Sequence, residues 1–270
     1  MCRWLAYSGP ELVLEDLLFK PENSLIQQSL AATRSIATTN GDGFGVGWYG
    51  QRTSPGVFRD TLPAWNDANL RSLAQQISSQ MFLAHVRAST GTATSRENCH
   101  PFRRGRLMFM HNGRVGGYAA LRRELEQMIP AEIYPGRNGT TDSEAIFLLA
   151  CGNGLAEDPG GALCRTVNQI LTLMQRSGSD EPFRMTAAVS DGHKIHAVRY
   201  SSDRESPSLF YGTGGSIEVA DSRVRFRSGA GSVLILSEPL DERCADWREV
   251  AEGQLIEVAD GQVTLRPFCP

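Results

Sequence analysis

The sequence predicts an α+β protein in which two mainly antiparallel sheets pack face to face and helices lie outside them. Three observations lead to this fold class. Short apolar strands alternate with helical segments along the 270 residues, the second half is dominated by strands joined through tight hairpins, and helical segments occur in both halves. Hairpins join antiparallel neighbours, so this pattern disfavours a doubly wound parallel sheet.

The strands of the first half are nearly continuous apolar runs, a pattern typical of buried central strands. Gly45 and Gly47, within the second run, leave room for another part of the chain to approach the backbone closely. The glycine-rich turn Asn40-Gly41-Asp42-Gly43 comes directly before that run. These strands are expected at residues 3–7, 44–49, 81–86 and 107–111.

Helices are predicted where apolar residues recur with a period near 3.6 residues. Asn66 or Asp67 is the expected N-cap of the third helix, and Thr141 or Asp142 is the expected N-cap of the fifth. Glu144 in the first turn of the fifth helix also suits the positive end of the helix dipole. The helices of the first half are expected at residues 11–20, 24–33, 67–77, 118–128 and 143–151.

The second half opens with a long amphipathic helix at residues 162–176 and then becomes mainly antiparallel sheet. Asp191-Gly192 and Asp260-Gly261 are the dipeptides that favour two-residue hairpin turns. We expect residues 2–270 to form one domain. The strands of this half are expected at residues 184–190, 194–200, 232–236, 254–258 and 262–265.

Charge and composition disfavour several classes of function. The formal net charge is −3 and both signs are mixed along the chain, so no basic face is available for nucleic acid or an anionic membrane. No apolar run approaches the roughly 18 residues of a membrane-spanning helix. No secretory signal opens the chain, so a cytoplasmic location is expected.

Metal and cofactor sites are also not expected. The six cysteines include no Cys-x-x-Cys pair, which argues against zinc ribbons and thioredoxin-like chemistry. His193 and His196 lie three residues apart on a predicted strand, so their side chains should leave opposite faces of the sheet. We therefore expect no metal and no cofactor.

Cys2 is the residue that most limits which reactions the protein could catalyse. If Met1 is removed, Cys2 carries a thiol and a free α-amine whose pKa is near ~7.7–8.0, so one residue supplies both a nucleophile and its base. The alternative is that Cys2 is a small buried hydrophobic residue. A lipid anchor is disfavoured, because only Met1 precedes the cysteine.

Three later segments carry groups suited to binding an amino acid. Arg87 follows a predicted strand and is suited to a carboxylate, Asn112-Gly113 offers amide donors for an oxyanion, and Asp142 places a carboxylate where it would bind an ammonium group. Each also has a structural interpretation: a surface ion pair for Arg87, an ordinary turn for Asn112-Gly113, and an N-cap for Asp142. Together with Cys2, they would serve an enzyme that attacks the side-chain amide of an α-amino acid.

Taken in order, these motifs resemble the class II glutamine amidotransferases, which have the four-layer αββα N-terminal-nucleophile (Ntn) hydrolase fold. The resemblance implies Cys2 as the catalytic nucleophile, Asn112 and Gly113 as the oxyanion hole, Arg87 with Thr90 as the α-carboxylate site, and Asp142 as the α-ammonium site. The motifs that carry it are Cys2, His85-Val86-Arg87 with Thr90, Asn98 with His100-Pro101, His111-Asn112-Gly113, and Thr141-Asp142 before Glu144.

Two departures from the family pattern bear on the substrate. Ala88 stands where an aromatic residue commonly follows the arginine, and Asn40-Gly41-Asp42-Gly43 replaces the usual Arg-Gly-x-Asp-Ser turn. A small side chain at position 88 would leave room for a substrate larger than glutamine. The opening residues look most like the stand-alone subgroup, which includes the γ-glutamyl amidohydrolases of ergothioneine synthesis and of glutathione breakdown.

The resemblance leaves three functions open. The first is autonomous hydrolysis of glutamine or a small-molecule γ-glutamyl compound through a γ-glutamyl thioester. The second is a glutaminase subunit that delivers ammonia to a separate synthase, and the third is a non-catalytic amino-acid-binding module. A synthase or peptidase partner protein and a homo-oligomer remain open as well. His100 and His111 are interpreted as structural supports, with a cysteine–histidine dyad as the alternative.

Overall fold

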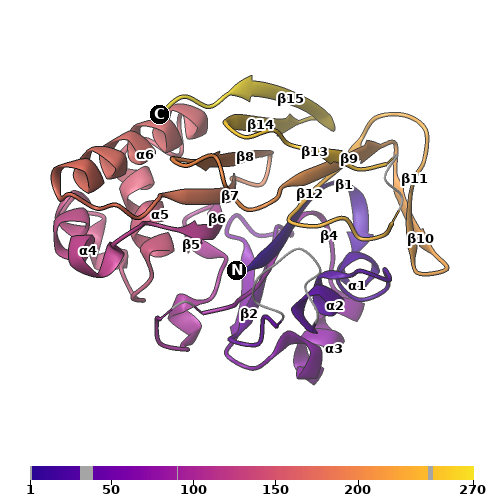
Figure 1. Ribbon diagram of the computed structural model, residues 1–270. Helices are drawn as coiled ribbons and strands as arrows, with labels where there is room; N and C mark the ends of the chain where they lie inside the picture. The colour runs from indigo at the N-terminus through magenta and orange to yellow at the C-terminus, as the bar shows by residue number, and fades with distance from the viewer. Residues whose placement is uncertain (1, 31–38, 90, 243–245) are drawn as a thin grey trace.

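Two antiparallel sheets lie against each other at the centre of the molecule, and helices lie on both outer sides (Figure 1). This arrangement confirms the predicted αββα sandwich. The computed structural model describes residues 2–30, 39–89, 91–242 and 246–270. Thr90, which belongs to the expected site, and Met1, whose removal the expected mechanism requires, lie outside these residues.

The first sheet has seven strands in the order β13-β9-β12-β1-β4-β2-β3, and its neighbouring strands pair antiparallel. The chain therefore begins in the middle of this sheet, between β12 and β4. The strands are β1 (Arg3–Val13), β2 (Phe44–Trp48), β3 (Gly56–Asp60), β4 (Ser78–Val86), β9 (Phe210–Gly214), β12 (Ser232–Leu236) and β13 (Arg248–Glu249).

The second sheet has six strands in the order β15-β14-β8-β7-β6-β5, also antiparallel. A two-stranded hairpin, β10 (Ile217–Ala220) with β11 (Arg223–Phe226), extends beside the first sheet (Figure 1). The strands of the second sheet are β5 (Phe102–Arg104), β6 (Leu107–Arg114), β7 (Arg184–Ser190), β8 (Lys194–Ser201), β14 (Gln254–Ala259) and β15 (Gln262–Pro267).

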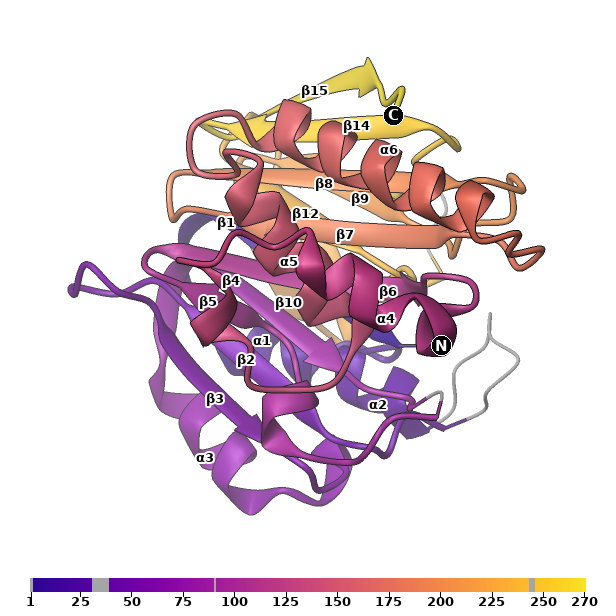
Figure 2. The same ribbon diagram turned by 90° about the vertical axis from the view of Figure 1, so that its left-hand side faces the viewer.

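The helices fall into two groups, one for each sheet. Figure 2 shows α4, α5 and α6 lying across the outer face of the second sheet, while α1, α2 and α3 lie beside the first. Short 3₁₀ turns η1 (Ala64–Asn66), η2 (Arg96–Asn98) and η3 (Tyr134–Gly136) lie in the connections. The helices are α1 (Leu14–Leu18), α2 (Leu25–Leu30), α3 (Ala68–Gln76), α4 (Tyr118–Gln127), α5 (Asp142–Gly152) and α6 (Pro159–Arg176).

Alternation along the central strands divides the apolar core into three layers. In β1, Leu5 and Tyr7 join the cluster beneath α1 to α3, whereas Trp4 and Ala6 join the cluster between the two sheets. Successive side chains of a strand leave opposite faces, so a strand covered on both faces must be apolar at every position. This explains why the continuous apolar run at residues 3–7 predicts a buried strand.

Two predicted helices of the first half differ from the structure. The prediction of a helix at residues 11–20 is wrong at its start, because Leu12 and Val13 continue β1 by pairing with Ser79 and Ser78 of β4. Only residues 14–18 of that range form an α-helix. The prediction at residues 24–33 is met by α2 at residues 25–30, and residues 31–33 lie outside the described part of the chain.

The structure decides between the alternatives for the helix caps. Asp67 caps α3, because its carboxylate accepts a hydrogen bond from the Leu70 N–H at 2.6 Å. Thr141 caps α5 by accepting from the Glu144 N–H at 3.3 Å. The side chain of Asp142, the other candidate for this cap, instead accepts from the Val115 N–H just after β6.

The placement of His193 also needs a correction. It lies in the turn between β7 and β8, and β8 begins at Lys194, so the two histidines do not share a strand. Across the described ranges, no helix combines the length and the apolar character needed to cross a membrane.

Candidate active site

Cys2 lies directly before the first paired residue of β1, beside the segment that follows β4. Register pairing of β1 begins at Arg3, which lies opposite Val86. The Cys2 side chain is half-buried, and its Sγ lies 3.6 Å from the carbonyl oxygen of Ala88, to which it donates. The structure thus places the N-terminal thiol next to the residue that follows Arg87.

Burial raises the pKa of the Cys2 thiol above its usual value. A hydrogen bond with the Ala88 backbone and the positive charge of Arg87 act in the opposite direction but do not outweigh burial. A thiol with a raised pKa is protonated at neutral pH, so it needs a base before it can act as a nucleophile.

Arg87 is buried, and its guanidinium is held by oxygen atoms of uncharged groups. It donates to the backbone carbonyls of Asp42 at 3.1 Å and Ala93 at 3.2 Å, and to the hydroxyl groups of Ser89 at 3.3 Å and Thr92 at 2.7 Å. Among the described residues it forms no ion pair. A buried guanidinium that is oriented but not neutralised is suited to bind an anion.

The predicted partner of Arg87, Thr90, lies outside the described residues. Sequence reasoning missed one neighbour of the guanidinium, the Thr92 hydroxyl. Asp42, in the glycine-rich turn, also belongs here, because its Oδ2 accepts from the Ser89 N–H at 2.7 Å. The run Ala88-Ser89-Thr90-Gly91-Thr92 was the available signal, because hydroxyl residues clustered around a glycine favour a tight loop.

Asn112 and Gly113 lie in the last part of β6. Asn112 is buried, and its Nδ2 has no hydrogen-bond partner within the described structure. Gly113 lies so close to β7 that an added Cβ would be 1.8 Å from the carbonyl oxygen of Arg184. Only glycine fits there, so the chain has an unused buried amide donor next to an obligatory glycine.

Asp142 connects the start of α5 to the end of β6. Its Oδ2 accepts from the Val115 N–H at 2.9 Å, and its Oδ1 accepts from the Ser143 N–H at 2.8 Å. Val115 follows Gly113 by two residues, so this carboxylate lies close to the Asn112-Gly113 segment. Thr141 rather than Asp142 provides the cap, which leaves the carboxylate on the side of α5 that faces β6.

Asn98 joins the Arg87 loop to the loop before α5. Its Nδ2 donates to the Ala93 carbonyl at 2.8 Å and to the Thr140 hydroxyl at 3.1 Å, and its Oδ1 accepts from the Thr140 N–H at 2.7 Å. The Ala93 carbonyl also accepts from Arg87. One hydrogen-bonded network therefore links the segment of Arg87 to the segment of Asp142.

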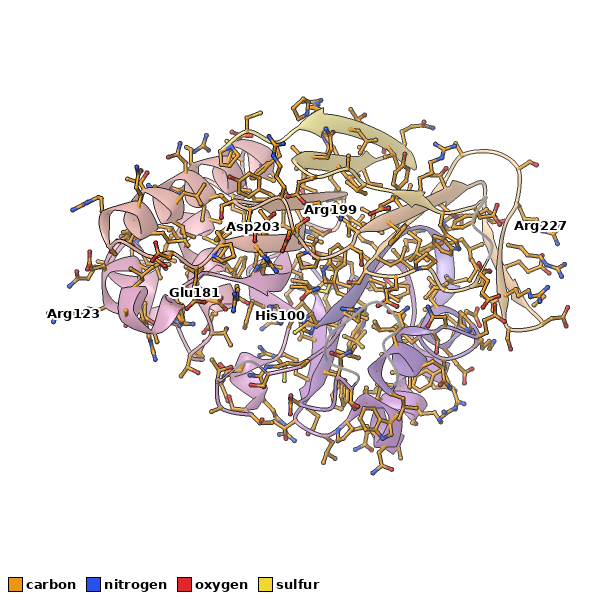
Figure 3. All side chains as sticks on the ribbon, viewed as in Figure 1. His100, Arg123, Glu181, Arg199, Asp203 and Arg227 are labelled. Atoms are coloured by element: carbon orange, nitrogen blue, oxygen red, sulfur yellow. The ribbon has the colours of Figure 1, made fainter. Side chains whose placement is uncertain are left out.

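Three histidines, His85, His100 and His111, are buried near these residues. The His85 and His100 rings are tilted by 36° with centroids 4.2 Å apart, and His111 Nδ1 lies 2.8 Å from the Ser143 hydroxyl. Figure 3 shows His100 well inside the molecule, whereas Arg123 and Arg227 project at its periphery.

Burial lowers the pKa of all three histidines, that of His85 to about 3. These rings are therefore neutral at neutral pH. The one hydrogen bond of the Cys2 thiol within the described residues goes to a carbonyl and not to an imidazole. This geometry favours histidines as structural supports over a cysteine–histidine dyad.

The described residues contain no group of three or more histidine, cysteine or acidic side chains arranged to hold a metal ion. Five cysteines, Cys2, Cys99, Cys151, Cys164 and Cys269, are free thiols in the structure, and Cys244 lies outside the described residues.

A family model described as "Glutamine amidotransferases class-II" matches residues 19–268. The chain belongs to the class II glutamine amidotransferases. It is an enzyme of this family, which sets aside the interpretation as a non-catalytic binding module. Amide hydrolysis is therefore the reaction that the residues described above have to serve.

Named relatives and solved structures agree with this assignment. The chain is 32% identical over 301 residues to the probable glutamine amidotransferase DUG3 of Saccharomyces cerevisiae, covering 99% of this chain and 84% of that protein. It is 26% identical over 270 residues to the γ-glutamyl-hercynylcysteine sulfoxide hydrolase of Mycolicibacterium smegmatis, covering 99% of this chain and all of that protein.

Among solved structures, a class II domain protein of Silicibacter pomeroyi matches with a TM-score of 0.74 and 36% identity over the full length of both chains. The glutamine phosphoribosylpyrophosphate amidotransferase of Bacillus subtilis has a TM-score of 0.65 at 15% identity, covering 98% of this chain and 49% of that one. At that identity the likeness concerns the fold alone.

Proposed function

We propose that this enzyme hydrolyses the side-chain amide of a γ-glutamyl compound through a thioester on Cys2. The observation that carries the proposal is the position of Cys2 at the head of β1, hydrogen-bonded to the residue after a buried Arg87 that has no described ion-pair partner. The family assignment makes amide chemistry the expected use of such a thiol.

The reaction begins with proton transfer from the thiol. After loss of Met1, the α-amine of Cys2 takes the thiol proton, directly or through a water, and the sulfur attacks the γ-carbonyl carbon. The Asn112 Nδ2–H and the Gly113 N–H stabilise the oxyanion. The protonated amine then gives its proton to the leaving nitrogen as the C–N bond breaks, and water hydrolyses the resulting γ-glutamyl thioester to glutamate and free thiol.

Arg87 and Asp142 would recognise the glutamyl headgroup. The α-carboxylate of the substrate adds a charge-assisted partner to the Arg87 guanidinium, with the Thr92 hydroxyl beside it. The α-ammonium group binds the Asp142 carboxylate, whose present partners are two backbone N–H groups and the Ser143 hydroxyl. The hydrogen bonds through Asn98 would hold these two binding groups at a fixed separation.

The substrate would be larger than free glutamine. Ala88, whose carbonyl oxygen lies beside the thiol, carries only a methyl side chain, which would leave room for a bulky leaving amine. The name of the Mycolicibacterium smegmatis relative specifies a γ-glutamyl compound with a large leaving group, and this chain covers that relative completely. We infer that γ-glutamyl dipeptides and related thiol-containing γ-glutamyl compounds are the substrate class.

A second candidate is a glutaminase subunit that passes ammonia to a separate synthase. The name of the Saccharomyces cerevisiae relative, a probable glutamine amidotransferase, favours it. It predicts weak activity on glutamine alone and strong stimulation by a partner. The first candidate predicts full turnover of a γ-glutamyl compound by the isolated chain.

The test combines intact-mass measurement with turnover assays. The mass shows whether Met1 is absent, and glutamate release is then measured on glutamine, γ-glutamylcysteine and glutathione. We expect higher kcat/KM for at least one γ-glutamyl peptide than for glutamine, and no turnover by Cys2→Ala. Full turnover by Cys2→Ala would refute the thioester mechanism, and a preference for glutamine would favour the ammonia-delivering subunit.

A further inference from the structure

We propose that a buried ion pair between Arg3 and Glu238 is a positioning device for the Cys2 nucleophile. Both side chains are almost completely buried. The Nε and Nη2 atoms of Arg3 each lie 2.6 Å from Glu238 Oε1, and Arg3 Nη1 donates to the Cys2 carbonyl oxygen at 2.8 Å. One guanidinium therefore holds the residue that carries the thiol and the segment after β12.

Cys2 needs such a support because no strand pairing fixes it. The register of β1 with β4 starts at Arg3, and that of β1 with β12 starts at Leu5. The described hydrogen bonds of Cys2 are the one from its thiol to Ala88 and the one from Arg3 to its carbonyl. The second of these determines where the backbone of the nucleophile lies.

The other end of the ion pair is itself held firmly. The Ser237 hydroxyl accepts from the Trp4 N–H at 3.0 Å, and the Ser237 N–H donates to the Trp4 carbonyl at 2.9 Å. The Glu238 carbonyl accepts from Gln28 Nε2 at 3.3 Å. Glu238 therefore fixes the position of the Arg3 guanidinium, and the Arg3 hydrogen bond in turn fixes the position of the Cys2 carbonyl.

A contribution to stability alone does not account for this pair. Removing two charges from water is costly, and well-packed apolar residues of similar volume often serve a folded protein equally well. The guanidinium also places a positive charge near the Cys2 sulfur, which lowers the thiol pKa against the larger effect of burial. A positioning role explains both the charge and the contact with Cys2.

This inference rests on Cys2 being the nucleophile of the proposed function, and its test separates positioning from stability. The double variant Arg3→Met/Glu238→Leu replaces the ion pair by apolar side chains. We expect it to fold, with kcat lowered by roughly tenfold to a hundredfold, the range that misplacement of a reacting group by about 1 Å produces. KM should change far less, because the altered residues do not contact the substrate.

A second readout is the pH profile of Cys2 alkylation by iodoacetamide, followed by mass spectrometry of the N-terminal peptide. Loss of the Arg3 charge should move the midpoint of this profile to higher pH. A purely structural pair would lower the melting temperature without lowering the kcat of the folded molecules. Wild-type kcat together with an unchanged alkylation profile would overturn the proposal.

Tyr49→Phe is the matched control. The Tyr49 hydroxyl donates to the carbonyls of Arg106, just before β6, and Ser190, at the end of β7. These contacts lie at the opposite end of the β6–β7 pair from Asn112. This variant should lower the melting temperature without changing kcat or the alkylation profile.

If the double variant does not fold, Arg3→Lys decides the question. Lysine keeps the positive charge but lacks the forked guanidinium that donates to Glu238 and to the Cys2 carbonyl at the same time. We therefore expect kcat to fall. Wild-type kcat in this variant would contradict the proposal. Failure of the proposed function would appear differently, as turnover that survives in Cys2→Ala.

Discussion

At the scale of single residues, the site combines a protonated thiol with donors and charges that the folded chain leaves incompletely paired. Asn112 shows this most clearly, because its amide nitrogen is buried without a described partner. A buried unsatisfied amide costs free energy in the resting protein. In the proposed mechanism that cost is recovered when an oxyanion forms beside the amide, so the group would stabilise a transition state rather than the fold.

Replacing Asn112 tests this interpretation. Asn112→Ala should lower kcat by about 10²–10³-fold, the usual effect of losing one oxyanion donor. Its melting temperature should stay close to that of the wild type, because the lost Nδ2 makes no described hydrogen bond. Steady-state kinetics and thermal unfolding on the same sample provide the measurement. A loss of kcat below threefold would remove Asn112 from the oxyanion hole.

The buried histidines predict how stability depends on pH. The pKa of His85 is lowered by burial to about 3, below its unfolded value near 6.5, so folding favours the neutral ring. Its contribution to stability is complete above about pH 6.5 and is lost progressively as the pH falls toward 3. Between pH 7 and pH 5 this single group should cost about 2 kcal/mol of unfolding free energy.

Urea unfolding at pH 7, 6 and 5 measures this effect. His100, whose pKa burial also lowers well below its usual value, should add to the loss. Carboxylates contribute mainly below about pH 5, so this window isolates the histidines. Unfolding free energies that agree within error at pH 7 and pH 5 would contradict the buried, neutral state of these rings.

At the scale of elements, helix α5 positions Asp142 and packs against the second sheet. Thr141 caps the helix, and the carboxylate that follows is held against the end of β6 by the Val115 N–H. The helix interior is apolar on all sides, and most of its residues are buried. A change at the cap therefore disturbs the start of α5, where the proposed ammonium site lies, and leaves the rest of the helix in place.

Thr141→Ala tests the coupling of this cap to the site. Loss of an N-cap side chain costs about 1 kcal/mol of stability, and the loosened first turn should also raise KM severalfold by displacing Asp142. Asp158→Ala is the control, because Asp158 caps α6 by accepting from the Gly161 N–H at 3.0 Å and lies outside the site. Equal effects of both variants on KM would show that cap loss acts through overall stability alone.

Elements with a strong local pattern were predictable from the sequence, and those that depend on partners were not. Asp191-Gly192 marked the β7–β8 hairpin, and periodicity marked α6, because both signals lie within a few neighbouring residues. Six short strands were missed, namely β3, β5, β9, β10, β11 and β13. Each has five residues or fewer and depends on pairing with a neighbour, as β3 does with β2 and β13 does with β9.

The candidate site was predictable in its residue types but not in its supporting contacts. Cys2, Arg87 and Asn112 lie in recognisable local motifs. The contacts of Asp42 with Ser89, and of Arg3 with Glu238, join residues that are 47 and 235 positions apart, and no local pattern reports such a pairing. The close approach predicted at Gly45 is real, since an added Cβ there would lie 2.0 Å from the His100 carbonyl oxygen.

At the scale of the whole molecule, the first strand of the chain is a central strand of the first sheet. Residues 3–8 pair with β4 on one side, and β12 covers the other side from Leu5 onward. The fold thereby holds the start of the chain close to the loops that carry Arg87 and Glu238. The nucleophile depends on this long-range assembly as much as on its own chemistry.

An N-terminal extension tests the role of the free amine at this scale. A variant in which Gly-Ser precedes Cys2 keeps the thiol but converts its amine into a peptide nitrogen, which cannot accept a proton. Turnover should fall by at least about a hundredfold, as expected for loss of a general base. Its melting temperature should stay near the wild-type value, because the half-buried Cys2 lies at the edge of the sheet ladder. Wild-type turnover by the extended chain would point to another base.

The pairing of β1 with β12 also has a consequence for biosynthesis. β1 is made before β12, the neighbour that completes its pairing, because β12 begins only at residue 232. At translation rates of roughly 5–20 residues per second, β1 waits on the order of ten to fifty seconds for that strand. The removal of Met1 that the proposed mechanism requires can therefore be finished before folding buries Arg3 and Trp4.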